Sequence, residues 1–298
     1  ALHPGAHVLH YASTCFEGLK AFTHPDGSRH IFRMDQNIAR LAQSSRLLSL
    51  PEVDEAMLRK MILDLVIRYK DEVPAPPGTL YLRPTHIGTE AAIGKAAAPS
   101  SQSMLYVLAS PVGDYFAGGD ATLRILIDEV GMRCAPHMGM VKSGGNYASA
   151  LQMLNKARVE HKADQVLFCP DGDVQETAAT NFMLIEGNEL VTKALDSTFL
   201  HGVTRASVLT LAAEMGLTVS ERNLSVAELI ERSAQPGAEA ALSGTAAILT
   251  PVGTLIYQGK DYTLGTGKPG PITIKLRKAL NDIQFGMAED RFGWLTQV

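Results

Sequence analysis

One stretch of turn-forming residues constrains the fold of this chain more than any other feature. Residues 111–119 read PVGDYFAGG, and proline and glycine at this density interrupt both helices and strands. We therefore expect a smaller N-terminal domain over residues 1–110, an interdomain loop over 111–119 and a larger C-terminal domain over 120–298. A chain of 298 residues with 46 % hydrophobic side chains can supply a core to each domain.

Apolar spacing predicts two helices and two strands before this loop. Asp35 is a candidate cap for a helix that runs to about Leu48, and Asp54 for a second helix that runs to about Tyr69. Residues 79–87 and 104–110 have the composition of strands.

Strand and helix patterns alternate beyond the loop. They predict strands over residues 123–128, 166–168 and 182–185, and helices over 147–161, 203–215 and 272–284. Asp171-Gly172 and Gly187-Asn188 are turn dipeptides between strands. The two halves together predict an α+β fold of two domains.

Composition excludes several classes of protein. The chain has 27 Lys and Arg against 31 Asp and Glu, so it lacks the basic excess of most nucleic-acid-binding proteins. No apolar run approaches the roughly 20 residues of a transmembrane helix. Cys15, Cys134 and Cys169 are too few and too far apart for a disulfide framework or a zinc ribbon. We expect no metal, no nucleic acid, no membrane and a cytoplasmic location, although the sequence leaves room for an organellar transit peptide upstream of residue 1.

The segment Lys142-Ser143-Gly144-Gly145-Asn146-Tyr147 is the most unusual in the chain. The lysine follows an apolar stretch and precedes an expected Gly-Gly turn, where the backbone can approach another group closely. Desolvation in a pocket can make a lysine amine a nucleophile toward an aldehyde. A solvated lysine before a flexible turn is the alternative. The order of residues is not that of a phosphate-binding P-loop.

Two further segments resemble anion sites. Residues 200–205, LHGVTR, place Gly202 and Thr204 at the start of a predicted helix, where free N–H groups favour a phosphate. Residues 243–247, SGTAA, form a second turn of small and hydroxyl residues. Each alone also suits an ordinary cap or packing site. With a reactive lysine, the two suit pyridoxal phosphate, which is a phosphorylated aldehyde.

Two more sets of polar residues fit such a site. The pyridine nitrogen of the cofactor must stay protonated if the ring is to accept electrons, and Glu176 at a strand end is a candidate partner for it. Tyr81 and Arg83 lie on one face of a predicted strand, where they suit a substrate carboxylate. The alternatives are a surface carboxylate and a half-exposed sheet face.

The chain resembles the branched-chain amino acid aminotransferases, in the fold-type IV group of pyridoxal-phosphate enzymes. The motifs that carry this resemblance follow one order over nearly the whole chain: His10-Tyr11, FEGLK at 16–20, IFR at 31–33, Arg40, YLRP at 81–84, IGTE at 87–90, SPVG at 110–113, Tyr115-Phe116, KSGGNY at 142–147, Glu176, GVTR at 202–205, SGTA at 243–246 and TPV at 250–252.

The resemblance implies a cofactor site for pyridoxal phosphate. Lys142 is the residue that would bind the cofactor covalently and then move a proton as the catalytic acid–base group. Glu176 would hold the pyridine nitrogen, and Tyr147 the phenolic oxygen. The phosphate would be bound by Arg40, the amides of Val203 and Thr204, and Thr245.

The resemblance also implies a substrate site. Thr245, Ala246 and Tyr81 would hold the α-carboxylate. The apolar walls would be Phe16, Tyr147 and Tyr115, and Arg83 would accept the side-chain carboxylate of glutamate. Tyr11 is expected to reach the site of a partner subunit.

We therefore expect a branched-chain amino acid aminotransferase that works as a homodimer or higher homo-oligomer. It would pass the amino group of L-leucine, L-isoleucine or L-valine to 2-oxoglutarate in a ping-pong reaction. The alternatives within the fold are a D-amino acid aminotransferase and an aminodeoxychorismate lyase-like enzyme. Outside it, the alternatives are a non-catalytic cofactor-binding protein and a nucleotide-binding module.

Overall fold

The computed structural model describes residues 1–113, 121–246 and 248–298. Tyr115, Phe116 and most of the expected interdomain loop lie outside these residues. The chain forms two compact units. The first comprises Ala1–Tyr115, Val141–Gly145 and Asp282–Val298, and the second Phe116–Met140 and Asn146–Asn281.

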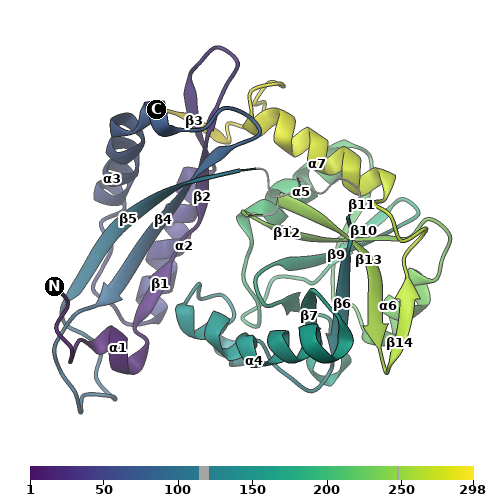
Figure 1. Cartoon of the computed structure of the whole chain (residues 1–298), viewed down its shortest axis with the longest axis horizontal. Helices are drawn as coiled ribbons and strands as arrows, with labels where there is room; N and C mark the ends of the chain where they lie inside the picture. The colour runs from purple at the N-terminus through teal and green to yellow at the C-terminus, as the bar shows by residue number, and fades with distance from the viewer. Residues whose placement is uncertain (114–120, 247) are drawn as a thin grey trace. The chain divides into compact units, whose positions relative to one another are not determined.

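The first unit is built on an antiparallel sheet (Figure 1) with the strand order β1-β4-β2-β3-β15, in which β5 also pairs with β4. The strands are β1 (Thr14–Phe16), β2 (Leu19–Thr23), β3 (Arg29–Phe32), β4 (Thr79–Gly88), β5 (Ser103–Val112) and β15 (Leu295–Gln297). The other elements are α1 (His7–Tyr11), α2 (Met34–Leu47), α3 (Glu55–Arg68) and the short 3-10 turn Lys70–Glu72. Apolar residues of α2, α3 and the sheet form one buried core.

The first unit is assembled from three separate stretches of chain, which differs from the contiguous ranges expected from the sequence. Ser143 makes an isolated β-bridge with Cys15, so residues 141–145 join the first unit beside β1. Strand β15 pairs with β3, which brings residues 282–298 to the same sheet. Both stretches, 141–145 and 282–298, join the first unit because their backbones pair with strands that lie far away in the sequence.

The two expected helix caps of this unit have different outcomes. Asp54 caps α3 as predicted, because its Oδ1 accepts a hydrogen bond from the amide of Met57 at 2.9 Å. The prediction that Asp35 caps the preceding helix is wrong. Helix α2 begins at Met34, with Arg33 at the N-cap in the left-handed region at φ 51°. Asp35 instead lies in the first helical turn, where its carboxylate binds Arg59.

The second unit is built on a mixed sheet that closes on itself. Its order is β11-β10-β9-β12-β13-β6-β7-β8, with β14 on β13, and a further pairing of β8 with β9 completes the ring. The strands are β6 (Leu123–Asp128), β7 (Gln165–Phe168), β8 (Glu176–Thr177), β9 (Asn181–Glu186), β10 (Glu189–Thr192), β11 (Thr218–Glu221), β12 (Glu239–Gly244), β13 (Ile248–Tyr257) and β14 (Lys260–Thr263). A large core of this unit is formed by apolar side chains of these strands and of helix α6 (Val226–Ser233).

Three helices of the C-terminal half lie where the apolar spacing predicts them, namely α4 (Gly144–His161), α5 (Val203–Glu214) and α7 (Pro271–Gln284). Helix α6 (Val226–Ser233) was not predicted, and 3-10 turns lie at Pro136–Met138 and Pro170–Gly172. The expected Gly-Gly turn is wrong, because Gly144 and Gly145 form the first turn of α4. Within the described residues, no helix is both long enough and apolar enough to cross a membrane.

Candidate active site

Lys142 belongs to the first unit, although it lies only two residues before α4. Its carbonyl oxygen accepts a hydrogen bond from the amide of Phe16 at 3.0 Å, and its amide donates to Ser44 Oγ at 3.2 Å. Its Nζ lies 5.0 Å from the centre of the Phe16 ring, which is within the range of a cation–π contact. The lysine therefore has a fixed backbone and a side chain beside an aromatic surface.

Arg83 contacts the same aromatic ring. Its guanidinium carbon lies 4.4 Å from the ring centre of Phe16, and its Nη2 donates to the hydroxyl of Tyr81 at 2.8 Å. Tyr81 and Arg83 thus share one face of β4, as side-chain alternation predicts. A Cβ at Gly18 would lie 2.2 Å from the Tyr81 hydroxyl, so only glycine leaves room for it there. The structure brings together four predicted site residues: Phe16, Tyr81, Arg83 and Lys142.

Arg40 lies in α2 and forms a buried ion pair with Glu17. Its Nε and Nη2 donate to the two carboxylate oxygens of Glu17 at 2.6 and 2.8 Å. Arg40 is 8 % exposed and Glu17 is 1 % exposed. Such a bidentate, charge-assisted pair fixes the plane of the guanidinium. A phosphate at Arg40 would therefore share the arginine with Glu17, a residue to which the sequence analysis gave no role.

Tyr11 is the last residue of α1. Its hydroxyl accepts a hydrogen bond from the amide of Gly94 at 2.9 Å, and its ring packs against that of His7 at a centroid distance of 4.8 Å. Its expected contribution to a partner subunit remains a prediction.

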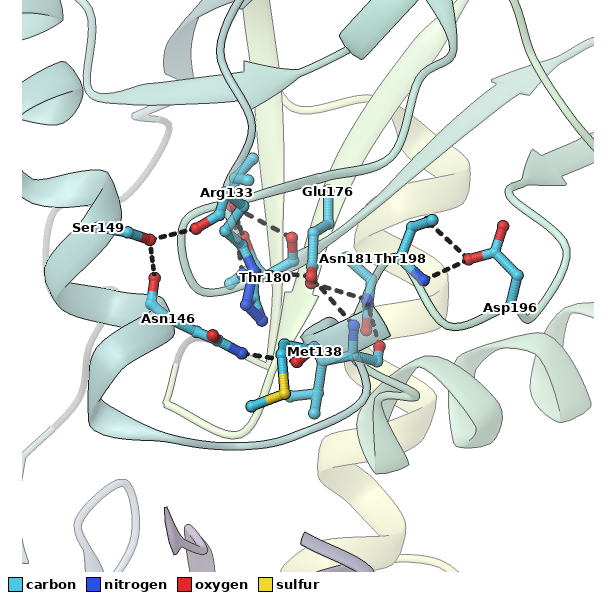
Figure 2. Close-up of polar contacts among 11 residues, drawn as sticks. Arg133, Met138, Asn146, Ser149, Glu176, Thr180, Asn181, Asp196 and Thr198 are labelled. Carbon is cyan, nitrogen blue, oxygen red and sulfur yellow. Dashed lines mark hydrogen bonds and ion pairs between the residues drawn. The ribbon is translucent and has the colours of Figure 1, made fainter. Parts of the chain in front are cut away.

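Glu176 is the central carboxylate of the second unit (Figure 2). It lies in the two-residue strand β8, which pairs with β7 through Phe168 and with β9 through Asn181. Its Oε1 accepts hydrogen bonds from Arg133 Nε at 2.7 Å and from the amide of Leu200 at 3.0 Å. The side chains of Glu176 and Arg133 are each 3 % exposed. Glu176 is thus a buried, ion-paired carboxylate, which excludes the surface-carboxylate alternative.

Arg133 and Asn181 are functional candidates that the sequence analysis missed. Asn181 Nδ2 donates to Glu176 Oε2 at 3.4 Å and to the carbonyl of Leu200 at 2.8 Å. Arg133 could have been found as a charged residue between Met132 and Cys134, shortly before the Lys142 segment. Asn181 has no comparable signal, because its role depends on the pairing of β8 with β9.

The N-terminus of α5 provides backbone N–H donors beside this carboxylate network. Gly202 is the N-cap, no side chain of the described residues caps the helix, and Val203 and Thr204 follow in its first turn. Their amides lack intrahelical acceptors, as at every helix start. A Cβ at Gly202 would lie 2.1 Å from Asn181 Oδ1. Glycine is therefore required for Asn181 and the helix start to lie this close together.

Thr245 and Ala246 lie in the turn between β12 and β13. Strand β12 reaches this turn from Ser243, which pairs with Asn181 of β9. Thr245 thus lies two residues after Ser243, whose strand partner Asn181 donates a hydrogen bond to Glu176. Tyr147 lies in the first turns of α4, next to Asn146, whose Nδ2 donates to the carbonyl of Met138 at 2.8 Å (Figure 2).

These residues fit pyridoxal phosphate by the chemistry of their donors. A phosphate suits the start of α5. A protonated pyridine nitrogen suits the buried carboxylate of Glu176, for which Arg133 supplies the counter-charge. An aldehyde suits the amine of Lys142.

Comparison with known proteins identifies the family. Residues 14–255 match the model of the amino-transferase class IV family. The chain belongs to the class IV aminotransferases. The match confirms the family resemblance found in the sequence.

Individual class IV relatives carry more specific names. The chain is 40 % identical to a probable branched-chain-amino-acid aminotransferase of Streptomyces coelicolor, over 99 % of this chain and 83 % of the relative. It is 39 % identical to branched-chain-amino-acid transaminase 1 of Bacillus subtilis, over 100 % of this chain and 85 % of the relative.

Solved structures of the family agree with the fold. The branched-chain amino acid aminotransferase of Escherichia coli superimposes with a TM-score of 0.83 at 26 % identity, covering 100 % of this chain and 94 % of that one. The enzyme of the same name from Thermobaculum terrenum, solved in its pyridoxal-phosphate form, gives 0.83 at 23 % identity, covering 100 % and 93 %. These likenesses confirm the two-domain, fold-type IV architecture predicted from the sequence.

Proposed function

We propose that this chain is a branched-chain amino acid aminotransferase that depends on pyridoxal phosphate. The observation that carries the proposal is the cluster in which Lys142 and Arg83 share the ring of Phe16. It combines a reactive amine, an apolar wall and a carboxylate-binding cation. The names of the full-length relatives favour this function over the D-amino acid aminotransferase and the lyase.

The cofactor would be held by the residues that the family resemblance assigns to it. Glu176 would accept a hydrogen bond from its pyridine nitrogen, and Tyr147 would donate one to its phenolic oxygen. Arg40, Thr245 and the amides of Val203 and Thr204 would bind its phosphate. When bound, the cofactor supplies an electron sink for the bonds at the substrate Cα. The amine of Lys142 would take the proton from Cα as the general base.

The substrate site would accept both an apolar and an acidic side chain. The ring of Phe16 offers an apolar surface to leucine, isoleucine or valine. Arg83, held by Tyr81, can pair with the side-chain carboxylate of glutamate on the same surface. The α-carboxylate would be bound by Tyr81, Thr245 and Ala246. Because both amino acids would use one site, the two half reactions can alternate in a ping-pong order.

The assembly and location are part of the same proposal. We infer a homodimer or higher homo-oligomer, in which Tyr11 contributes to the site of a partner subunit, and a cytoplasmic enzyme. Sedimentation of the purified chain tests the oligomeric state. Loss of leucine turnover in Tyr11→Ala without loss of the assembly tests the contribution of Tyr11 to the partner's site.

A visible spectrum of the purified chain tests the function directly. We expect a yellow band that L-leucine removes, that 2-oxoglutarate restores and that D-alanine leaves unchanged. After borohydride reduction, mass spectrometry should find the cofactor on the peptide that contains Lys142, and Lys142→Ala should abolish that adduct. A colourless chain that takes up no pyridoxal phosphate would contradict the proposal. Conversion by D-alanine would favour the D-specific alternative.

A further inference from the structure

The backbone of Lys142 is held on both sides by the first unit. On one side its amide donates to Ser44 Oγ of α2 at 3.2 Å. On the other its carbonyl oxygen accepts from the amide of Phe16 in β1 at 3.0 Å. Ser44 is fully buried and lies 98 residues from Lys142 along the chain. The contact therefore belongs to the tertiary fold and not to a local turn.

Helix α2 carries Ser44 one turn after Arg40. Residues four apart lie on one face of a helix, and both of these side chains are buried. Arg40 is itself fixed by its two hydrogen bonds to Glu17, which adjoins Phe16. One helix face thus holds the arginine expected at the phosphate and the hydroxyl that binds the lysine backbone.

We propose that Ser44 is a positioning residue for the amine of Lys142, so that α2 sets the place of the lysine relative to Arg40. The proposal rests on the proposed role of Lys142. A lysine side chain has four rotatable bonds and does not fix the position of its own amine. The backbone from which the side chain starts must therefore be held in place. Ser44 Oγ is a side-chain acceptor for that backbone amide, and the first turn of α4 begins only two residues later.

Removing the hydroxyl should disturb the lysine without touching the cofactor or the substrate. The Lys142 amide would lose this acceptor, while the 141–145 segment would keep the β-bridge of Ser143 with Cys15. Misplacement of a catalytic group by about 1 Å can slow turnover on the order of a hundredfold. Substrate binding should change little, because Ser44 is fully buried and its hydroxyl binds the lysine backbone.

The test compares three variants of the full-length chain loaded with pyridoxal phosphate. Ser44→Ala removes the hydroxyl and leaves a small gap. Ser44→Cys fills that gap with a sulfur that is only a weak acceptor, so an effect seen in both variants does not come from the gap. Ser233→Ala is the matched control, because Ser233 is a buried helical serine whose hydroxyl donates within its own helix to Ile230 at 2.9 Å. Circular dichroism establishes that each variant is folded.

For both Ser44 variants we expect kcat for L-leucine to fall on the order of ten- to hundredfold, with KM changed by less than about twofold. Hydrogen exchange of the Lys142 amide should accelerate about tenfold. The pH at which the visible band titrates should shift, because the band reports on the lysine adduct. Ser233→Ala should match the wild type in all three measurements.

The two proposals fail in different ways. A wild-type chain without transamination overturns the proposed function. A wild type that transaminates normally, with folded Ser44 variants whose kcat, titration and Lys142 exchange are unchanged, overturns the positioning role of Ser44 alone. A rise in KM with unchanged kcat and exchange also overturns it, because that result would place Ser44 in substrate binding.

Discussion

At the residue scale, the buried pair of Arg133 and Glu176 is the most demanding electrostatic feature of the second unit. Both side chains are 3 % exposed, and Arg133 Nε donates to Glu176 Oε1 at 2.7 Å. An ion pair removed from water depends on both partners, because either charge left alone keeps its desolvation cost. Removing one partner should therefore lower the free energy of unfolding more than replacing both partners together.

We expect Arg133→Met to lower the free energy of unfolding by about 3–5 kcal/mol, because Glu176 would remain as an uncompensated buried charge. The double variant Arg133→Met with Glu176→Gln should regain most of that loss. Urea denaturation of the chain without added cofactor measures all four members of the cycle. If the effects of the two substitutions simply add, the two side chains are not coupled and this account of Glu176 is wrong.

The sequence indicates candidate residues with reactive side chains, but not the residues that hold them in place. Lys142, Glu176 and Arg83 have reactive or charged side chains within unusual local patterns, which is why the sequence could propose them. Arg133 and Glu17 act on partners 43 and 23 residues away, and no local spacing records such contacts. Supporting residues become visible only when the fold joins them to the residue that they support.

At the scale of single elements, α7 has a cap that comes from a distant strand. Glu239 of β12 accepts hydrogen bonds from the amides of Ile272 and Thr273 at 3.0 and 2.8 Å. Its negative charge also opposes the positive end of the helix dipole. A Cβ at Gly270 would lie 2.0 Å from Glu239 Cδ, so Gly270 leaves the space that the cap occupies.

We expect Glu239→Ala to lower the free energy of unfolding by about 0.5–2 kcal/mol, the usual cost of a lost cap. Gly270→Ala should cost a similar amount, because it displaces the same carboxylate. The double variant should cost little more than either alone, since one interaction is lost only once. Thermal or urea denaturation can follow the series. Additive losses would mean that Gly270 acts independently of the cap.

Helices were predicted better than short strands. The helices α3, α5 and α7 have regular apolar spacing, and their observed bounds lie close to the expected ones. Strand β2 was not predicted, because it has only five residues, LKAFT, and its lysine is buried together with its apolar neighbours. A strand without alternation of apolar and polar side chains has no signature of period two.

At the scale of the whole molecule, the two units are not two consecutive halves of the chain. Residues 282–298 complete the first unit after the chain has passed through the second. There Trp294 accepts a hydrogen bond at its carbonyl from the amide of Arg33 at 2.7 Å, and its ring packs edge-on against Phe32. The sequence predicted two domains, but it could not predict that residues 282–298 rejoin the first one, because this depends on long-range backbone pairing.

Trp294 is also the single tryptophan of the chain, so its fluorescence reports on the folding of the first unit. The same unit contains His86 of β4, which is 2 % exposed and whose Nδ1 lies 2.9 Å from Ser45 Oγ. Burial lowers the pKa of His86 below its usual 6.5, because the charged imidazolium loses its hydration. The unfolded chain therefore binds a proton at His86 more readily than the folded chain does.

A lowered pKa in the folded state stabilises the fold above the unfolded pKa, and this contribution is lost as the pH falls through the folded pKa. We expect the free energy of unfolding of the first unit, followed by Trp294 fluorescence in urea, to decrease between about pH 7.5 and about pH 5. His86→Gln cannot titrate, so its stability should depend less steeply on pH, while the contribution of His30, whose pKa is also lowered by burial, stays in both proteins. Equal slopes for the wild type and His86→Gln would show that the buried imidazole is not what makes this unit sensitive to acid.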